Sequence, residues 1–439
     1  MPLSVLIGAQ WGDEGKGKIV DLLARRVDWV ARFSGGPNAG HTVRIDGETF
    51  VLHLLPSGIL RPGVCCLIGH GVVLDLDHLE REIQSLEERG VRIDDRLKIS
   101  SAAHLLLPYH RWLEELQHQD VRVGTTKRGI GPAYQDKMGR VGLRVHDLLD
   151  ERHLKDRLEE ELSRVEAMHR GWGRPMPEIP RQASLEWARR YAGIARRLGP
   201  AIVDTVALLH GELDAGKSVL CEGSQGTFLD IDLGTYPFVT SASTTIGGAI
   251  AGLGLPPSRI SRVIGVAKAY TTRVGNGPFP TEFGERIAGS FRKKAGEFGA
   301  TTGRPRRCGW FDAVLVRHAV RVNGIGEICL TKLDVLTGMR TLKLAVGYRV
   351  GRRTLEHPPV DPAEWAACKP VYEDLPGWTK EIGGARAPED LPAEARRYVE
   401  KIEALCGAPV RLVSVGSARE AAVRMPARRR PAARRGRRS

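Results

Sequence analysis

The chain has 439 residues, of which 42% are hydrophobic and 27% charged, as in globular proteins, and its formal net charge is +14. This length supports one large α/β domain or two ordinary ones. No apolar run approaches the roughly 20 residues that span a bilayer, and no signal peptide is recognisable, so we expect a cytoplasmic protein without membrane contact.

The first predicted element is a short apolar strand at residues 3–7, followed by the glycine-rich run GDEGKGK at residues 12–18. The apolar residues within 19–23 then give the buried face of a helix. A strand, a glycine-rich turn and a helix N-terminus aim backbone N–H groups at one point, which makes a phosphate cradle. Lys16 and Lys18 add positive charge there.

This run has the P-loop spacing of a glycine, four residues, a glycine and a lysine, from Gly12 to Lys18. Ile19 stands where a P-loop has the serine or threonine that holds Mg²⁺. Another group must therefore take the metal, and the carboxylate of Asp13 is the nearest candidate because Mg²⁺ prefers hard oxygen ligands. A lone glycine-rich loop is often only a tight turn, so nucleotide binding needs support from elsewhere in the chain.

A second predicted strand, at residues 29–33, leads into GGPNAGHT at residues 35–42. Its glycines let the backbone approach a ligand closely, and His41 has the side chain that changes charge near neutral pH. A lone histidine after a strand is more often structural than catalytic. Because we expect Asp13 and His41 on neighbouring strand-end loops, however, they could face one substrate as base and acid.

Further apolar, β-branched runs predict strands, with helices between many of them. Apolar residues three and four positions apart predict helices within 76–86 and 154–165, and the proline-rich interval 170–181 reads as a surface connection. This alternation predicts an α/β fold with a large, mainly parallel sheet flanked by helices and with ligands at the carboxyl ends of the strands. The remaining predicted strands are residues 65–73, 218–221, 262–267, 327–330, 341–350 and 410–415.

The predicted strand at 327–330 runs into TKLD, residues 331–334. In guanine-specific P-loop proteins, a strand ending in N/T-K-x-D sets its aspartate against the guanine N1–H and exocyclic amine, two donors that adenine does not present together. Alone, such a tetrapeptide is usually a solvated strand end. Together with the glycine-rich loop it makes Asp334 a candidate base reader and predicts GTP rather than ATP.

The end of the chain carries much of the positive charge. Residues 424–439 hold eight arginines and no acidic residue, which leaves +6 of the +14 for residues 1–423. We expect one catalytic domain over 1–423 and a disordered, arginine-rich tail over 424–439, because prolines and small residues between arginines cannot build a core. A solvated basic end is a better interpretation of this tail than a specific nucleic-acid contact.

Seven blocks of the chain resemble adenylosuccinate synthetases in one register from about residue 3 to 416. Seven separated blocks are unlikely to match by chance, so this signal is far more specific than any single motif. The blocks are QWGDEGKGK (10–18), GGPNAGHT (35–42), residues 124–145, residues 222–245, TTGRPRRCGWFD (301–312), LTKLDVL (330–336) and SVG (414–416).

The resemblance implies a P-loop NTPase-related fold and a GTP-dependent ligase. The implied reaction joins L-aspartate to IMP through a 6-phosphoryl-IMP intermediate and gives adenylosuccinate, GDP and phosphate, the first committed step from IMP to AMP. Asp13 matches the base that takes the N1 proton and His41 the acid on the β-phosphate side, and Lys16 and Gln225 complete the catalytic set. The implied ligands of Mg²⁺, one ion per subunit, are Asp13 and the carbonyl of Gly40.

The ligand contacts are also carried over residue by residue. A homodimer is implied as well, because Arg140 matches an arginine that reaches the neighbouring subunit's IMP site. For GTP the contacts are Gly12, Asp13, Glu14, Gly15, Lys16, Gly17, Lys18, Gly40, His41, Thr42, Arg306, Lys332, Leu333, Asp334, Ser414, Val415 and Gly416. For IMP they are Asp13, Glu14, Gly15, Lys16, Asn38, Ala39, Gly40, His41, Thr126, Arg140, Gln225, Thr240 and Arg304. For L-aspartate they are Ala300, Thr301, Thr302, Gly303, Arg304, Pro305 and Arg306.

Two other functions stay open at this point. A regulatory GTPase would hold or cleave GTP without a purine acceptor, but it leaves residues 35–42 and 301–307 without a role. An RNA-binding protein would use the arginine tail, with strongly salt-dependent binding. The chain departs from the family at Pro305, where many members carry a basic residue, and over residues 417–423, which puts the last turns of the fold in doubt.

Overall fold

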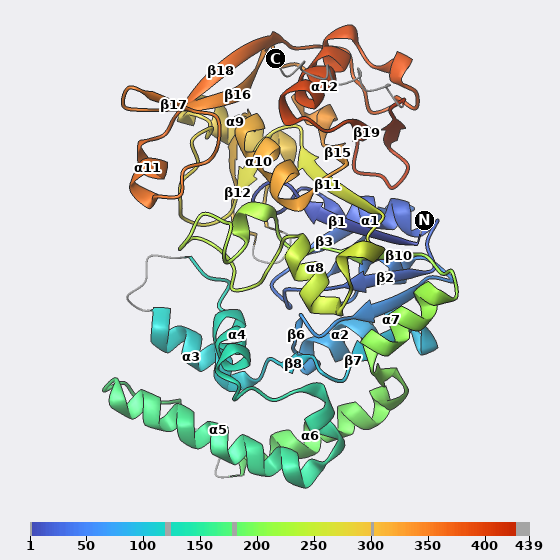
Figure 1. Cartoon of the computed structure of the whole chain (residues 1–439), viewed down its shortest axis with the longest axis vertical. Coiled ribbons are helices and arrows are strands. Elements are labelled where there is room, and N and C mark those ends of the chain that lie inside the picture. Colours follow the sequence, from blue (N-terminus) through green and yellow to red (C-terminus); the bar gives the residue numbers. More distant parts are fainter. Residues whose placement is uncertain (1, 119–123, 178–181, 300–302, 427–439) are drawn as a thin grey trace, which may run out of the picture.

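The structure is a computed structural model that describes all residues except 1, 119–123, 178–181, 300–302 and 427–439. In the described part, its largest element is a ten-stranded sheet with the strand order β20-β19-β15-β11-β1-β10-β2-β5-β7-β9. All neighbouring strands are parallel except β19 and β20. Helices flank this sheet (Figure 1), so the predicted architecture is confirmed.

The central strands β1 and β2 are buried at every residue, as expected for strands covered on both faces. The strands of the main sheet are β1 (Leu3–Gly8), β2 (Trp29–Arg32), β5 (Cys65–Ile68), β7 (Leu97–Ser100), β9 (Ile202–Val203), β10 (Val219–Glu222), β11 (Arg262–Lys268), β15 (Glu327–Thr331), β19 (Val410–Ser414) and β20 (Ala422–Arg424). The α-helices are α1 (Lys16–Ala24), α2 (Leu76–Glu87), α3 (Pro108–His118), α4 (Ile130–Gly139), α5 (Glu151–Gly171), α6 (Ala183–Leu198), α7 (Thr205–Asp214), α8 (Ile246–Leu253), α9 (Glu285–Ala295), α10 (Ala313–Asn323), α11 (Pro362–Ala367) and α12 (Ala393–Cys406).

Smaller sheets extend the fold beyond the main one. A four-stranded sheet lies at the top of Figure 1 and contains β16, so the predicted strand 341–350 forms but does not join the main sheet. Its strands are β14 (Phe311–Asp312), β16 (Thr341–Val350), β17 (Arg353–Leu355) and β18 (Lys369–Pro376). The two-stranded pairs are β3 (His41–Ile45) with β4 (Glu48–Leu52), β6 (Val73–Leu74) with β8 (His104–Leu105), and β12 (Thr271–Arg273) with β13 (Arg307–Gly309).

The single strand predicted at 65–73 is wrong, because the run is split between two sheets. β5 ends at Ile68, and β6 pairs with β8 elsewhere. Between them the chain passes so close to Phe33 that a Cβ on Gly71 would lie 2.0 Å from the Phe33 carbonyl oxygen. Only glycine fits this approach, and the main-sheet ladder stops there.

The end of the fold is ordered further than the sequence predicts. Arg424, the first residue of the expected tail, is the last residue of β20 and pairs with Leu412 of β19. The unusual segment 417–423 is fixed to α1, because the guanidinium of Arg419 donates to both carboxylate oxygens of buried Asp21 at 2.6 and 2.7 Å. Residues 427–439 of the predicted tail lie outside the described residues.

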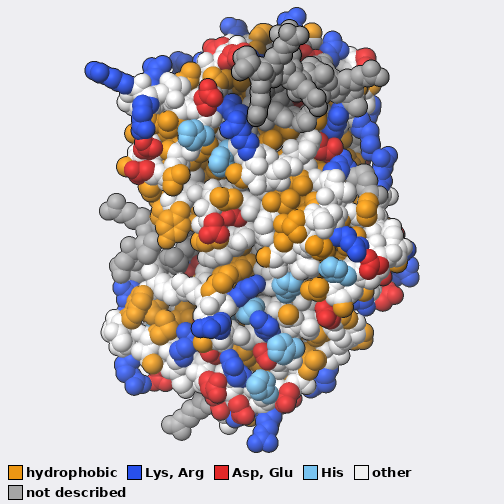
Figure 2. All heavy atoms as spheres, viewed as in Figure 1, with side chains coloured by type: hydrophobic (Ala, Val, Ile, Leu, Met, Phe, Trp, Pro, Cys, Tyr) orange, Lys and Arg blue, Asp and Glu red, His pale blue; other side chains and the backbone are white. Residues whose placement is uncertain are grey.

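None of the described helices is long and apolar enough to cross a bilayer. Positive and negative side chains are interspersed over the face shown in Figure 2. This mixture agrees with the modest charge that remains once the arginine-rich end is set aside.

Candidate active site

A cavity of about 990 Å³ lies at the carboxyl ends of the central strands. The loops after β1, β2, β10, β15 and β19 all contribute to its wall, as expected for an open parallel sheet. This volume is at the upper end for small-molecule sites and has room for a nucleotide together with a second ligand. No sequence motif singled out Val274 and Lys293, which also line it.

The glycine-rich loop after β1 is built around Glu14, whose side chain is fully buried. Glu14 Oε1 accepts the backbone N–H groups of Gln10 at 3.0 Å and Gly12 at 2.9 Å, and Oε2 accepts from Lys16 Nζ at 2.7 Å. Glu14 was predicted as a ligand contact, but its carboxylate lies inside the loop, and Glu14 is not part of the cavity wall. It shapes the cradle and orients Lys16.

The backbone of this loop takes a conformation that favours glycine. Gly12, Asp13 and Gly15 have positive φ angles of 82°, 58° and 83°. Gly15 is the N-cap of α1, so the unpaired N–H groups of the helix N-terminus open beside the cavity. This arrangement is the predicted anion cradle.

Lys18 lines the cavity, and its ammonium is also held by the end of the fold. Its ammonium donates to the Ser414 hydroxyl at 2.7 Å and to the carbonyls of Gly416 at 2.7 Å and Ala421 at 2.9 Å. These acceptors use all three of its N–H bonds, and burial lowers the pKa of Lys18 to about 8. Lys18 therefore ties α1 to the segment after β19, and Lys16 remains the lysine of the cradle.

Asp13 lies at the cavity wall with its carboxylate partly exposed. The Nε of Arg306 lies 2.7 Å from Asp13 Oδ2. Arg306 comes from the glycine-flanked arginine loop, nearly 300 residues later in the chain. The predicted base and the predicted aspartate-binding loop therefore meet at one point.

His41 is held by a residue that the sequence analysis missed. Glu222, the last residue of β10, is fully buried, and its Oε1 pairs with His41 Nδ1. The same carboxylate accepts the Ser57 hydroxyl at 2.6 Å and the Ser57 N–H at 2.7 Å. Its only sequence signal was a carboxylate at the end of an apolar strand. Asp13 and His41 were expected on neighbouring strands, but β10 lies between β1 and β2 and supplies Glu222 there.

The contact with Glu222 affects both the pKa and the ring orientation of His41. Burial lowers the pKa of His41, and the nearby Glu222 carboxylate opposes that shift. The Nδ1 contact fixes the ring orientation and leaves Nε2 for the cavity that His41 lines.

Gly17 keeps His41 in place, which gives a test of the geometry. A Cβ on Gly17 would lie 2.8 Å from the Cβ of His41. We expect Gly17→Ala to displace His41 and so to lower kcat for the ligase reaction that the resemblance implies by about 10²-fold. The same substitution should favour the helix by about 1 kcal/mol, because alanine has a higher helix propensity than glycine. Steady-state kinetics and thermal melting measure both effects. Gly211→Ala in α7, where a Cβ meets open space, is the matched control; an unchanged kcat in Gly17→Ala would refute the steric argument.

Most residues predicted for IMP line the cavity, whereas Glu14, Arg140 and Arg304 do not. Gln225, at a positive φ of 54°, donates from Nε2 to Asn38 Oδ1 at 3.4 Å. Its Oε1 is buried without a hydrogen-bond partner among the described residues, so it is available to a ligand. Arg140 is the exposed C-cap of α4, away from the wall. The residues predicted for IMP that line the wall are Asp13, Gly15, Lys16, Asn38, Ala39, Gly40, His41, Thr126, Gln225 and Thr240, and Thr42, predicted for GTP, lines it as well.

The segment predicted to read the base, residues 331–334, lies against the glycine-rich loop. The Thr331 hydroxyl donates to the Glu14 carbonyl at 2.6 Å. Asp334 lines the cavity, its Oδ1 is buried without a described hydrogen-bond partner, and burial raises the pKa of its carboxyl. Leu333 and Val415 are buried outside the wall, so only their backbones could contact a nucleotide.

The arginine loop stands on a short hairpin stem. The N–H of Gly299 donates to the Arg304 carbonyl at 2.8 Å, and the N–H of Arg306 donates to the Glu297 carbonyl at 3.0 Å. Arg306 reaches the wall, whereas Gly303, Arg304 and Pro305 are exposed. The predicted contacts Ala300, Thr301 and Thr302 lie outside the described residues.

Comparison with known proteins gives this arrangement a family. A family model described as adenylosuccinate synthetase matches residues 5–423. An adenylosuccinate synthetase of Moorella thermoacetica is 53% identical over 424 residues, covering 96% of this chain and 98% of the relative. One of Acidothermus cellulolyticus is 50% identical over 434 residues, covering 97% and 100%. The structure of the fully ligated Plasmodium falciparum adenylosuccinate synthetase matches with a TM-score of 0.91 at 36% identity, covering 97% of this chain and 100% of that chain. Since both the sequence and the fold match from end to end, this chain belongs to the adenylosuccinate synthetase family.

Proposed function

We propose that this chain is a GTP-dependent ligase that joins L-aspartate to IMP and releases adenylosuccinate, GDP and phosphate, on the route from IMP to AMP. The observation that carries the proposal is one cavity lined by Asp13 and His41, the phosphate cradle and Asp334. Such a site holds a guanine nucleotide and a second substrate at once. A regulatory GTPase would not need the part of this wall that is assigned to IMP.

The purine oxygen of IMP is a poor leaving group, so the first step activates it. Asp13 takes the N1 proton, the O6 atom gains the negative charge, and O6 attacks the γ-phosphorus of GTP. The bond to the β-phosphate oxygen breaks, and GDP leaves. Lys16 and the loop amides neutralise and position the phosphates, which accounts for most of the catalysis in phosphoryl transfer.

His41 stabilises the charge that develops on the β-phosphate side. Burial disfavours its protonated form in the structure described here. The phosphates of a bound nucleotide place negative charge beside the ring, which raises the pKa of the imidazole, and Glu222 supports the cation from the other side. His41 is thus ready to donate a proton only when the nucleotide is in place.

In the second step the amine of L-aspartate attacks C6, and phosphate leaves with the former purine oxygen. The substrate carries two carboxylates, and guanidinium groups bind carboxylates with two parallel hydrogen bonds. We assign this role to the loop with Thr301, Thr302, Arg304 and Arg306. Arg306 lies 2.7 Å from Asp13, so this loop reaches the reacting purine.

The donor atoms of the site fit Mg²⁺. Asp13 supplies a carboxylate and Gly40 a carbonyl, and both residues line the cavity. The described residues contain no group of three His, Cys, Asp or Glu that would form a metal cage. Mg²⁺ needs few protein ligands, because it usually keeps phosphate oxygens and waters as its other ligands. When bound, the ion would neutralise charge on the phosphates.

Arg140 points to a homodimer. It is exposed on α4 and outside the cavity of its own subunit. We assign it to the IMP site of a neighbouring copy. Mixing Arg140→Leu with Asp13→Asn subunits would then restore activity in mixed dimers, whereas a monomer would show no recovery.

An assay of the purified protein tests the function. Adenylosuccinate formation should require IMP, L-aspartate, GTP and Mg²⁺ together, and GTP should stay intact when IMP is omitted. GTP cleavage without IMP, and without any adenylosuccinate in the complete mixture, would favour the regulatory GTPase instead.

Asp334→Asn should change the nucleotide specificity. The carboxylate accepts two guanine N–H groups, and loss of such charge-assisted hydrogen bonds should lower kcat/KM for GTP by about 10²-fold or more. Xanthine has a carbonyl in place of the exocyclic amine, so the amide introduced by this substitution would pair with XTP. Steady-state kinetics with both nucleotides check this. The parent enzyme, which should prefer GTP to XTP, is the control. Equal losses for GTP and XTP would refute the base-reading role.

A further inference from the structure

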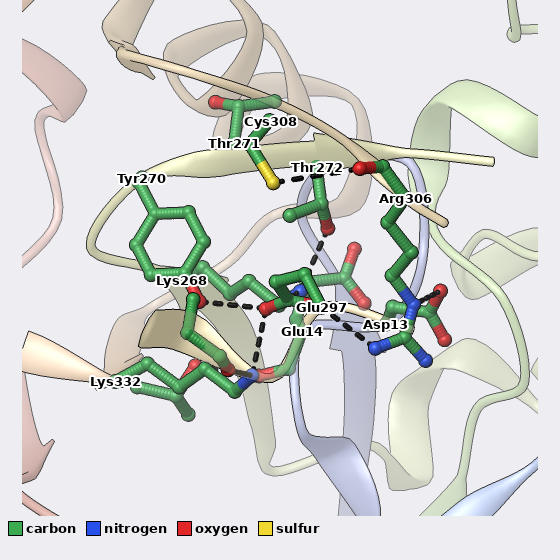
Figure 3. A network of polar contacts seen from close by, with 12 residues as sticks. Asp13, Glu14, Lys268, Tyr270, Thr271, Thr272, Glu297, Arg306, Cys308 and Lys332 are labelled. Carbon is green, nitrogen blue, oxygen red and sulfur yellow. Dashed lines mark hydrogen bonds and ion pairs between the residues drawn. The ribbon is translucent and has the colours of Figure 1, made fainter. Parts of the chain in front are cut away.

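Beneath the cavity lies a buried cluster of charges that no motif predicts. Its centre is Glu297, which is 0% exposed and follows α9 (Figure 3). Glu297 Oε1 accepts from Lys268 Nζ at 2.8 Å, from Tyr270 OH at 2.6 Å and from Lys332 Nζ at 2.7 Å. Its other oxygen, Oε2, accepts from Arg306 Nη1 at 2.7 Å.

One carboxylate therefore faces three cations, each from a different part of the fold. Lys268 ends β11, Lys332 follows β15 in the base-reading segment, and Arg306 belongs to the arginine loop. Burial alone would raise the pKa of Glu297, but the three cations hold it well below its usual range. Glu297 is thus a fixed anion that neutralises part of a cationic cluster.

The contacts of Glu297 form a chain between the two ends of the site. Lys332 neighbours the base reader Asp334, and Arg306 uses its Nε to reach Asp13 while its Nη1 is held by Glu297. The backbone carbonyl of Glu297 also accepts the Arg306 N–H at 3.0 Å. Figure 3 shows Arg306 between Glu297 and Asp13, with Lys332 on the opposite side of Glu297.

We propose that Glu297 is a positioning residue that aims Arg306 at L-aspartate and links the guanine-reading segment to the aspartate loop. This inference rests on the proposed function. Glu297 acts through Arg306 and Lys332. Its two contacts with Arg306, one from the backbone carbonyl and one from the side chain, fix the position of Arg306 at the base of the loop.

Glu297→Gln tests this role because it keeps the size of the side chain and removes its charge. One charge-assisted hydrogen bond changes an equilibrium constant by about 10- to 100-fold, so the KM for L-aspartate should rise by that factor. The KM for IMP should stay within about twofold, because none of the side chains that contact Glu297 belongs to the residues predicted for IMP. Glu297→Asp, which keeps the charge, should recover part of the loss.

Glu282→Gln is the matched control. Glu282 forms a bidentate ion pair with Arg307, the residue after Arg306, on the outside of the same segment. Its loss removes a carboxylate from an arginine in the same way but touches neither Lys332 nor Arg306. All three KM values should stay within about twofold of the parent.

A double variant guards against misfolding. Where Glu297→Gln alone fails to fold, the pair Lys268→Met with Glu297→Gln removes one buried cation with the anion and keeps the net charge of the cluster. It should show the same selective rise in the KM for L-aspartate.

The outcomes separate the two claims. An inactive parent enzyme would overturn the proposed function. An active parent whose KM for L-aspartate is unchanged by Glu297→Gln would overturn only the inference about Glu297. Equal rises in all three KM values, without recovery in Glu297→Asp, would also overturn it, because they would indicate a purely structural role.

Discussion

Replacing His41 by asparagine is expected to lower kcat for adenylosuccinate formation by about 10²- to 10⁴-fold, the usual contribution of a general acid. Asparagine retains a polar group near Glu222 but has no proton to give to the β-phosphate side. The KM values should change little, because the cradle and the base reader stay intact. Steady-state kinetics measure this result, and a thermal melt within a few degrees of the parent shows that the fold persists.

Two further variants sharpen the test of His41. His210→Asn, on α7 and remote from the cavity, is the matched control and should be fully active. Glu222→Gln should lower kcat less than His41→Asn. Because Glu222 acts through His41, the double variant should be no slower than His41→Asn alone. Multiplied losses in the double variant would show that Glu222 has a separate role.

Replacing Asp13 by asparagine is expected to have the largest effect, a loss of at least about 10⁴-fold in kcat. We assign this carboxylate as the base for N1 and as a metal ligand; the neutral amide cannot take the proton, and its uncharged oxygen is a weaker ligand for Mg²⁺. Asparagine is a better choice than alanine because Asp13 has a φ of 58°, a conformation that asparagine tolerates. The change therefore tests the chemistry without adding backbone strain.

Asp46→Asn supplies the control for Asp13. Asp46 also has a positive φ, of 49°, but it is exposed in the turn between β3 and β4. The same chemical change at the same backbone conformation should leave kcat and the melting temperature unchanged. An Asp13→Asn enzyme that retains a tenth or more of the parent's kcat would contradict both assigned roles of this carboxylate.

Much of the fold could be predicted from local pattern. Runs such as residues 3–7 and 29–33 are apolar and β-branched because their strands are buried on both faces. The order of the strands could not be predicted, because it depends on packing between distant segments. The placement of β10 between β1 and β2, and the transfer of β16 to a second sheet, are of this kind.

The candidate site, too, could be predicted from local sequence only in part. Glycine-rich runs reveal where backbone must approach a ligand, so the cradle and the loop before His41 could be recognised from residues close together in the chain. The partners that hold these residues lie far away in sequence. Glu222 is 181 positions from His41, and Glu297 is 35 positions from Lys332. No spacing rule connects such pairs, and a lone glutamate has no distinctive pattern.

Lys18 shows that a motif gives a residue's position in the chain but not its contacts. Its spacing matches the P-loop lysine, and its ammonium donates to Ser414, Gly416 and Ala421. Ser414 and Gly416 lie in the predicted SVG block, whereas Ala421 lies in segment 417–423, which the sequence left uncertain. No local pattern connects a lysine with acceptors 396 to 403 residues further along the chain.

The central claim is that GTP phosphorylates O6 of IMP before L-aspartate attacks C6. IMP labelled with ¹⁸O at O6, incubated with the enzyme, GTP, Mg²⁺ and L-aspartate, tests it most directly. Mass spectrometry of the released inorganic phosphate should find one ¹⁸O per molecule, in step with adenylosuccinate. Unlabelled phosphate together with labelled water would contradict this account, because the purine oxygen would then have left without ever bonding to phosphorus.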